Sequence, residues 1–368
     1  MFSAITRAVG GTLDAFLGRG AYAVTVPAMD GPLQPNNDLE HARAALQVAA
    51  PDNLILVDGT IIFSSGSQLL ELDAGAGTAR TLADLGAEIS ALAALPDGGI
   101  ALGLSNGEIV FRGGANDGAS VVALGDYKGV CPTALLADGE ALVVAQGSAL
   151  RGPGEWCRDL VERGASGSVW RLDPKNRAAT CLGNGLAYPN GLAWDGDGGI
   201  VASESWRHRL VKLTRGGAKP GIVLEHLPGY PSRLAPTAGS GYWLTVFAPR
   251  SSLIEFVLRE NEFKRRMMAE IPEEYWVAPR LASGRSFKEP MQNGAIKAMG
   301  ILKPWAPTRS FGLLVRLDRG MSPIASHHSR SDGHRHGISS AVEIGGTVYI
   351  ASKGSNEILA LPSDGSSR

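Results

Sequence analysis

The chain has 368 residues, of which 44% are hydrophobic and 19% are charged, and 48 are glycines. This mixture suits many short strands joined by tight turns and excludes a disordered chain. A formal net charge of −1 gives no electrostatic basis for binding nucleic acid, so we expect a small-molecule substrate or ligand as the main partner.

The first 50 residues precede a series of repeats, and we expect 1–50 to form a segment packed on the domain that follows. Apolar residues within 2–17 fall on one helical face, which predicts a packed cap or, alternatively, a weak membrane anchor. Arg7 and Asp14 interrupt this apolar stretch, so it does not match a signal peptide. We therefore expect a cytoplasmic protein without a transmembrane segment.

Residues 51–368 contain one pattern six times, in most cases about 40 residues apart. Each copy has an apolar run, a turn that contains Gly, an alternating strand and a second strand that ends in an aliphatic residue. The six copies are 54–73, 92–112, 135–173, 192–213, 234–258 and 339–361. Asp-Gly and Gly-Gly turns between such runs indicate hairpins, and four-stranded units at this spacing are typical of propeller blades. The sequence predicts an all-β fold, a six-bladed β-propeller, with a β-sandwich as the alternative.

The interval before the last copy is much longer than the others. Residues 259–310 begin with the charged, helix-like run ENEFKRRMMAEIPEEYW. We predict a partly helical insertion before the last blade, lying on one face of the propeller. There it could act as a lid over the central channel, or it could be a surface decoration or a contact for another protein.

Several motifs follow one another at blade spacing in the second half of the chain. They are WCRD at 156–159, GSVWRLD at 167–173, YPNGLAW at 188–194, LPGYP at 227–231 and GYWLTV at 241–246. In this order the motifs resemble the strictosidine synthase-like family, within the superfamily of SMP-30 proteins, gluconolactonases and paraoxonases. The resemblance implies a six-bladed propeller with its substrate in the central channel.

The same resemblance implies a hydrolase acting on a lactone or an ester. Strictosidine-forming enzymes instead join an amine to an aldehyde and use a glutamate near the start of the last blade. The matching position falls at or next to Ser339, which has no useful acid or base group. The alternatives are therefore a non-catalytic small-molecule-binding propeller, or a C–N bond-forming or lyase-type enzyme with a changed catalytic residue.

The resemblance also implies a divalent cation, usually calcium, held on the channel axis by carboxylate and amide oxygens. Asn190 and Asp52 stand at two of the expected ligand positions, although Asn190 could instead serve its Pro-Asn-Gly turn. Cys131 and Ser232 stand where two other ligands are expected. Arg233 brings a positive charge towards the cation's place, where it could bind a carboxylate-bearing ligand or form a structural ion pair.

Four of the seven histidines lie within residues 326–337, directly before a predicted inner strand. Histidine titrates near neutral pH and can act as a base, an acid or a metal ligand. His336, nearest to the strand, is our first catalytic candidate, and His334 is a candidate contact for the substrate. The alternatives are a transition-metal site at these two residues and an exposed loop with neither role.

Glu204 is the second catalytic candidate. It lies in the strand ASES, where alternation would place Trp206 on the same face, lining the channel. The alternative is an ion pair with Arg207 or Arg209.

Aromatic residues fall near the ends of several predicted strands or in the preceding loops. We expect Trp156, Tyr188, Trp206 and Tyr230 to form, with Arg233, the substrate-binding pocket, or else to pack between blades.

Overall fold

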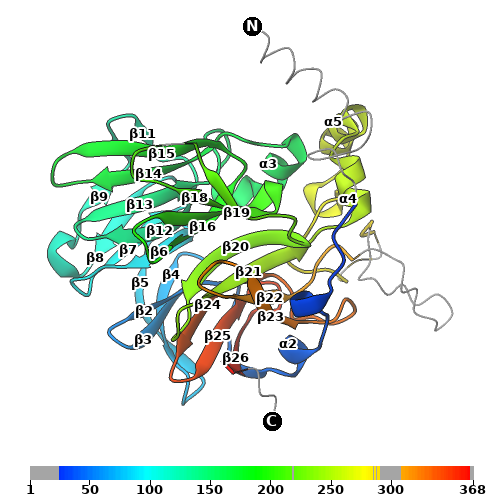
Figure 1. The fold of residues 1–368 in the computed structure, drawn as a ribbon, viewed down its shortest axis with the longest axis horizontal. Coiled ribbons are helices and arrows are strands. Elements are labelled where there is room, and N and C mark those ends of the chain that lie inside the picture. The colour runs from blue at the N-terminus through cyan, green and yellow to red at the C-terminus, as the bar shows by residue number, and fades with distance from the viewer. Residues whose placement is uncertain (1–24, 218, 285, 287, 291–307, 365–368) are drawn as a thin grey trace, which may run out of the picture.

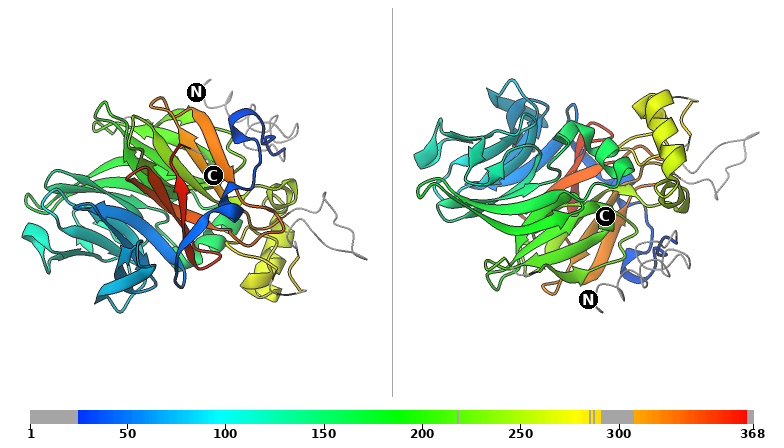
Figure 2. Two further views of the ribbon diagram at one scale, coloured as in Figure 1. Left: turned by 90° about the horizontal axis from the view of Figure 1, so that it is seen from below. Right: turned by 90° about the horizontal axis from the view of Figure 1, so that it is seen from above.

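The protein is described by a computed structural model that covers residues 25–217, 219–284, 286, 288–290 and 308–364. Its main sheets are six four-stranded antiparallel sheets arranged in a ring (Figure 1), which confirms the predicted six-bladed β-propeller. Two further views show the same blades with the helices gathered at one side of the ring (Figure 2). The predicted membrane anchor at 2–17 lies outside the described residues.

Each blade runs from an inner strand at the channel to an outer strand at the rim. The first three blades are β2 (Pro51–Val57), β3 (Thr60–Ser65), β4 (Gln68–Asp73), β5 (Thr78–Asp84); β6 (Ile89–Ala94), β7 (Ile100–Leu104), β8 (Ile109–Arg112), β9 (Ser120–Val121); and β12 (Pro132–Asp138), β13 (Ala141–Gln146), β14 (Gly167–Asp173), β15 (Ala178–Leu186). The last three are β16 (Pro189–Trp194), β17 (Ile200–Glu204), β18 (Arg209–Leu213), β19 (Gly221–Leu224); β20 (Gly229–Pro236), β21 (Tyr242–Pro249), β22 (Leu313–Leu317), β23 (Pro323–His328); and β24 (Ile338–Ile344), β25 (Thr347–Ser352), β26 (Glu357–Pro362), β1 (Arg43–Gln47).

Short elements connect the blades. They are the hairpin β10 (Ala123–Leu124) and β11 (Tyr127–Lys128), the 3-10 turns η2 (Gly31–Leu33), η3 (Gly114–Asn116), η4 (Pro153–Glu155), η5 (Ser205–Arg207) and η6 (Glu273–Tyr275), and the helices α2 (Asp38–His41), α3 (Trp156–Glu162), α4 (Ser252–Val257) and α5 (Asn261–Glu270). Two of the predicted turns, Asp58–Gly59 and Gly345–Gly346, have positive φ at both residues, as a two-residue type I′ hairpin requires.

The core of the propeller consists of apolar clusters between neighbouring blades. For example, Phe63 and Leu70 of the first blade pack with Ile358 of the last, and Val143 of the third packs with Leu192 of the fourth. Successive residues of an inner strand point to opposite faces of its sheet, so each strand contributes to two clusters. The alternation of the repeats therefore encodes the packing of every blade on both neighbours.

The N-terminal part of the chain completes the last blade. Strand β1 pairs with β26, so Arg43–Gln47 belong to the propeller itself, although we had assigned residues 1–50 to a segment packed on it. Arg335 secures the entry to β1, because its Nη1 donates to the carbonyl oxygens of Leu39 and Glu40, both at 2.9 Å. Its Nε contacts Glu357 Oε2 at 3.1 Å.

The helical insertion precedes the last blade, as predicted, but it lies inside the fifth blade, between β21 and β22. The predicted strand at the end of 234–258 is helix α4. Ser251 caps this helix by accepting a hydrogen bond from Ile254 N at 3.2 Å. Ile254 and Val257, three residues apart, are buried against α3 and α5, so the helical spacing is satisfied by packing.

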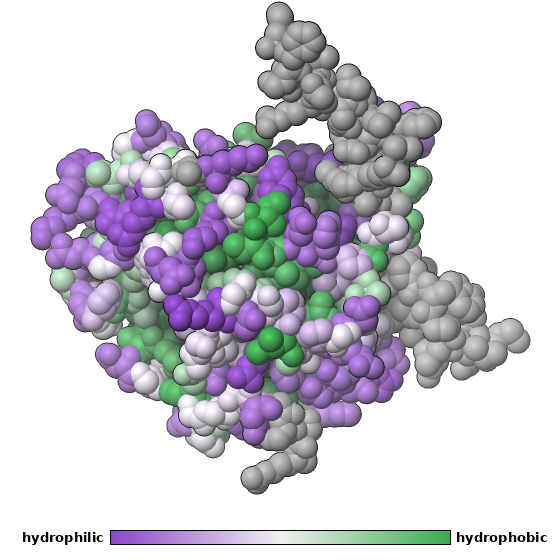
Figure 3. Space-filling view, in the orientation of Figure 1, coloured by the Kyte–Doolittle hydropathy of each residue, from purple (hydrophilic) through white to green (hydrophobic). Residues whose placement is uncertain are grey.

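The face of the molecule shown in Figure 3 is mostly polar where it is coloured, with apolar patches in between. Among the described residues, no helix combines the length and the apolar character that a membrane span requires.

Candidate functional site

A ring of polar side chains surrounds one end of the channel, and each blade contributes one of them. They are Asp52, Ser90, Thr133, Asn190, Ser232 and Ser339, each the residue after a Pro or Ile near the start of its inner strand. In every blade, the register between the inner strand and its neighbour shifts at or next to the ring residue of that strand. A β-bulge re-aims side chains, so the shift explains how these residues reach the pocket at the axis.

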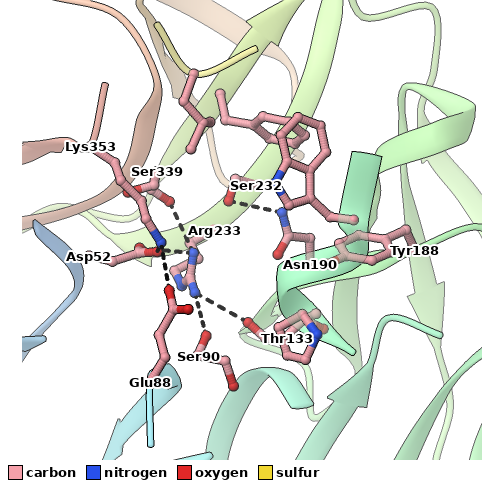
Figure 4. A pocket seen from close by; sticks show the side chains of 14 residues that line it. Asp52, Glu88, Ser90, Thr133, Tyr188, Asn190, Ser232, Arg233, Ser339 and Lys353 are labelled. Carbon is pink, nitrogen blue, oxygen red and sulfur yellow. Dashed lines mark hydrogen bonds and ion pairs between the residues drawn. The ribbon is translucent and has the colours of Figure 1, made fainter. Parts of the chain in front are cut away.

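Arg233 occupies the centre of this ring (Figure 4). Its Nη1 lies 3.1 Å from Asp52 Oδ1, and its Nη2 donates to Ser90 O at 2.8 Å. Longer contacts of 3.4 Å reach Thr133 O and Ser339 O. The guanidinium of β20 therefore joins the inner strands of four other blades.

Two more charged residues extend the cluster towards the channel mouth. Lys353, which follows β25, places Nζ 3.3 Å from Asp52 Oδ2 and 3.4 Å from Glu88 Oε1. Burial opposes the charge of Lys353, but Asp52 and Glu88 raise its pKa above the ordinary value. Burial likewise opposes the charge of Asp52, whereas Arg233 and Lys353 lower its pKa. Both groups are therefore charged at neutral pH.

Aromatic rings form the opposite wall of the pocket. Trp156, Tyr188 and Phe247 line it, and Trp156 meets Phe247 edge to face at 5.4 Å between ring centroids. Tyr188 has φ +58°, a left-handed conformation that costs a residue other than glycine about 1–3 kcal/mol. Its ring stacks on Trp206 at 4.4 Å, so this stack holds the strained Tyr188 against the pocket.

The insertion contributes to the rim of the same pocket, since Leu281 lines it. Two glycines of the last blade permit this approach. A Cβ on Gly354 would lie 2.0 Å from Leu281 O, and one on Gly337 would lie 2.7 Å from the same atom. The insertion is thus seated on the closing blade beside the channel mouth, a place that suits either of the roles we expected, a lid or a surface decoration.

The structure brings together five of the residues that we predicted for the site. Asp52, Trp156, Tyr188, Asn190 and Arg233 all line one pocket, with a cavity volume of about 90 Å³.

Three other predicted residues do not line this pocket and have contacts elsewhere in the protein. Trp206 and Tyr230 form a second aromatic layer behind the pocket, with their ring centroids 5.9 Å apart. Trp206 lies in η5 because β17 ends at Glu204, so the expected strand alternation does not apply. His334 has an exposed side chain, 3.8 Å from Glu40.

Neither predicted catalytic residue lines the pocket. Glu204 is fully buried and forms ion pairs with Arg207 and Arg209, and it accepts a hydrogen bond from Ala187 N at 2.7 Å. His336 is buried, with one ring nitrogen 2.7 Å from Ser310 Oγ and the other 2.7 Å from Arg330 O. Both side chains hold loops in place, which corrects our expectation that they face the channel.

The donor set at the axis does not fit calcium, which takes six to eight oxygen ligands. The Asp52 carboxylate is already paired with two cations, and Asn190 donates its amide to Ser232 Oγ at 3.1 Å. Burial raises the pKa of the Cys131 thiol to about 12, so it is not a thiolate ligand. Among the described residues, no three His, Cys, Asp or Glu side chains are placed to hold a metal ion.

Two small members of the ring, Ser90 and Thr133, and both flanking charges were not predicted from the sequence. Ser90 and Thr133 could have been found from their common offset in each repeat, directly after Ile89 and Pro132. Lys353 and Glu88 lie in connections outside the inner strands, and no pattern in the sequence places them at the axis.

A cluster of Glu255, His208 and Arg250 attaches the insertion to the fourth blade. Burial lowers the pKa of His208, so at neutral pH this imidazole contacts Glu255 through a hydrogen bond and Arg250 carries the opposite charge. Glu255 of α4 lies 3.2 Å from both His208 Nε2 and Arg250 Nε. Burial would raise the pKa of Glu255, but His208 and Arg250 lower it from 4.5 to about 2. A carboxyl with a depressed pKa stabilises the fold above its unfolded pKa and loses that contribution as the pH falls through the folded value.

We therefore expect Glu255→Gln to lower the free energy of unfolding at pH 7 by an amount on the order of 3 kcal/mol. The difference from the wild type should shrink between pH 4.5 and pH 2. Urea denaturation of both proteins at several pH values measures it, and a difference that stays constant down to pH 2 would contradict this assignment.

The fold and the site define a six-bladed propeller with a polar, aromatic-walled pocket at one end of its channel. Comparison with known proteins shows which of them it resembles. A stretch of 116 residues is 29% identical to strictosidine synthase-like protein 13 of Arabidopsis thaliana, covering 31% of this chain and 28% of that protein. A longer stretch of 227 residues is 24% identical to strictosidine synthase-like protein 6 of Arabidopsis thaliana, covering 61% and 53%.

Among solved structures, a gluconolactonase from Xanthomonas campestris superposes with a TM-score of 0.54 over 92% of this chain and 96% of that one, at 15% identity. No family model matches the chain. The match spans about half the length, or less, of the two curated relatives. The chain is thus similar in sequence to strictosidine synthase-like proteins and shares its propeller fold with the gluconolactonase, which confirms the predicted resemblance.

Proposed function

We propose that this protein binds a small organic molecule at the channel mouth, without a divalent cation. One observation carries the proposal: the Arg233 guanidinium stands among the inner strands and is paired with Asp52, a position expected to bind the metal. A fixed cation in this place performs the electrostatic role of a metal in holding the ring of polar groups together. It also leaves no oxygen cage that a metal would need.

The chemistry of the pocket defines the ligand class. Lys353 uses two of its three N–H donors on Asp52 and Glu88, and no described residue accepts the third. This donor can bind a carboxylate or a carbonyl oxygen. The facing wall of Trp156, Tyr188 and Phe247 suits a flat apolar body. An aromatic carboxylate combines both features, and the small cavity admits one ring or one end of a larger molecule.

The test measures metal content and binding in the same preparation. Elemental analysis of purified protein should find less than one calcium per ten chains. Phenylacetate should raise the melting temperature equally with calcium and with EDTA, because ligand binding to the folded state stabilises it. Lys353→Met should weaken this binding at least tenfold, whereas Lys175→Met, which removes an exposed lysine paired with Glu140, should not. Stoichiometric calcium, or binding that requires it, would overturn the proposal.

A second candidate is hydrolysis of a lactone or an ester; the gluconolactonase neighbour's name describes action on a lactone. The unpaired N–H of Lys353 favours it, since a fixed donor can stabilise the oxyanion that forms when water attacks a carbonyl. In the same preparation, δ-lactones and aryl esters should then be hydrolysed faster than in buffer, with the rate lost in Lys353→Met. If the protein binds these compounds but does not hydrolyse them, its function is binding and not hydrolysis.

A further inference from the structure

Trp206 is the ring that connects the aromatic side chains of the candidate site. Its ring centroid lies 4.4 Å from that of Tyr188, in a stacked pair with the planes 27° apart. The centroid of Phe247 is 6.3 Å away at 71°, and that of Trp156 is 6.3 Å away at 35°. Stacked and edge-to-face rings attract each other beyond the burial of their area. The position of Trp206 therefore supports the wall that the other three rings present to the pocket.

One polar contact sets the orientation of the Trp206 indole. Its Nε1 donates to Asp159 Oδ1 at 2.7 Å, across 47 positions of the chain. Trp206 lies in η5 of the fourth blade, and Asp159 lies in α3, which precedes β14 of the third. A hydrogen bond to a carboxylate is stronger than one between neutral groups. The bond therefore favours one orientation of the indole over those in which Nε1 has no partner.

Asp159 is an uncommon acceptor, because it is a buried carboxylate without a cation. The residue is 3% exposed, and no lysine, arginine or histidine of the described residues forms an ion pair with it. Burial raises the pKa of Asp159, although hydrogen bonds from Trp206 and Ser148 act to lower it. Gly164 leaves room for the carboxylate, since a Cβ there would lie 2.3 Å from Asp159 Oδ1. An unpaired buried charge destabilises a fold, so stability gives no reason for a carboxylate at this position.

Tyr188 needs the support of Trp206, because it lines the pocket in a left-handed conformation with φ +58°. A residue other than glycine keeps such a conformation only where its surroundings hold it there. Trp206 covers one face of the Tyr188 ring, and Asp159 holds Trp206. The contacts from Asp159 through Trp206 to Tyr188 thus end at the pocket, although Asp159 itself does not line it.

We propose that Asp159 is a positioning residue that makes the pocket selective for aromatic over aliphatic carboxylates. By orienting Trp206, it keeps Tyr188 in place as part of a flat wall against which a ligand ring packs. A saturated ring gains burial at this wall but no ring-to-ring attraction, so a displaced wall affects its binding less. The inference rests on the proposed function, in which Lys353 holds the carboxylate on the side of the pocket opposite Tyr188 (Figure 4).

Titration calorimetry with phenylacetate and cyclohexylacetate tests this role, because the two compounds share a carboxylate and differ in the flatness of the ring. The wild type should bind phenylacetate about fivefold more tightly. Asp159→Leu removes the acceptor at similar side-chain size. It should weaken phenylacetate binding about tenfold and cyclohexylacetate binding about twofold, so that the selectivity is lost. Asp159→Asn keeps an acceptor oxygen and should retain the wild-type selectivity.

Trp206→Phe tests the same hydrogen bond from its other end, since it keeps an aromatic ring and removes the donor. It should lose the selectivity as Asp159→Leu does. Glu162→Leu, on the same helix but with an exposed side chain paired with Arg151, is the matched control and should leave both affinities unchanged. Circular dichroism identifies variants that have not folded.

The outcomes separate this inference from the proposed function. If neither compound binds to the wild type, the proposed function fails, and the role of Asp159 fails with it. If the wild type binds phenylacetate but folded Asp159→Leu or Trp206→Phe keeps the selectivity, only the role of Asp159 is refuted. A loss of selectivity in Asp159→Asn would also refute it, because the hydrogen bond to Trp206 would then not be its cause.

Discussion

Replacing Arg233 with methionine is expected to lower the free energy of unfolding by about 3–5 kcal/mol, because it leaves the buried Asp52 carboxylate with only one of its two cations. The Arg233 side chain is only 17% exposed, so water can replace few of its contacts. The substitution also removes the guanidinium that contacts Asp52 and donates to the carbonyl oxygens of Ser90, Thr133 and Ser339, one residue in each of four blades. Urea denaturation at pH 7 measures the change.

The control for this substitution is Arg319→Met, which removes an exposed arginine paired with Asp197 and should cost less than about 1 kcal/mol. Adding Asp52→Asn to Arg233→Met should recover part of the loss, since the uncompensated carboxylate is then gone. A loss below about 1 kcal/mol for Arg233→Met would mean that the guanidinium does not hold the inner strands together. The internal-cation interpretation would then fail.

Replacing Arg335 with methionine is expected to open the propeller at its closing blade. The side chain of Arg335 is 12% exposed and donates to the carbonyls of Leu39, Glu40 and Ala42. Without it, three acceptors at the entry to β1 and the buried Glu357 lose a charged donor. We expect a loss of about 3–5 kcal/mol and faster proteolysis before β1.

Limited proteolysis and urea denaturation of this variant are compared with those of Arg43→Met. Arg43 is an exposed residue on β1 itself, so its substitution should change the free energy of unfolding by no more than about 0.5 kcal/mol. Hydrogen exchange should show lost protection in β1 and β26 only for Arg335→Met. Unchanged proteolysis and exchange would mean that the β1–β26 pairing suffices to close the ring.

The repeats predicted the fold well because a hairpin is a local structure. Turns such as Asp58–Gly59, with alternating residues on both sides, select their pairing without reference to the rest of the chain. The position of α4 was less predictable, because the apolar residues of SLIEFV suit either a strand or a helix until Ile254 and Val257 find their partners on α3 and α5.

The candidate site was predictable only in part. Asn190 and Arg233 were found because their motifs match ligand positions of the family that the sequence resembles, and Tyr188 because it directly precedes a predicted inner strand. Glu204 and His336 were chosen for residue type. Glu204 instead pairs with Arg207 and Arg209, which was the alternative interpretation. His336 contacts Ser310, 26 residues earlier in the chain, and no local pattern predicts that contact.

The sequence by itself determined the number of blades, the alternation that packs them and the end of each inner strand at which polar residues stand, because all of these depend on neighbours within one repeat. Only the tertiary structure decided that β1 closes the last blade, that the insertion sits beside the mouth and that Arg233 occupies the centre of the polar ring. These features depend on contacts between residues far apart in the chain, such as Arg233 with Ser90 and Ser339, more than 100 positions away. No local pattern encodes such a contact, since the partners meet only when the ring is closed.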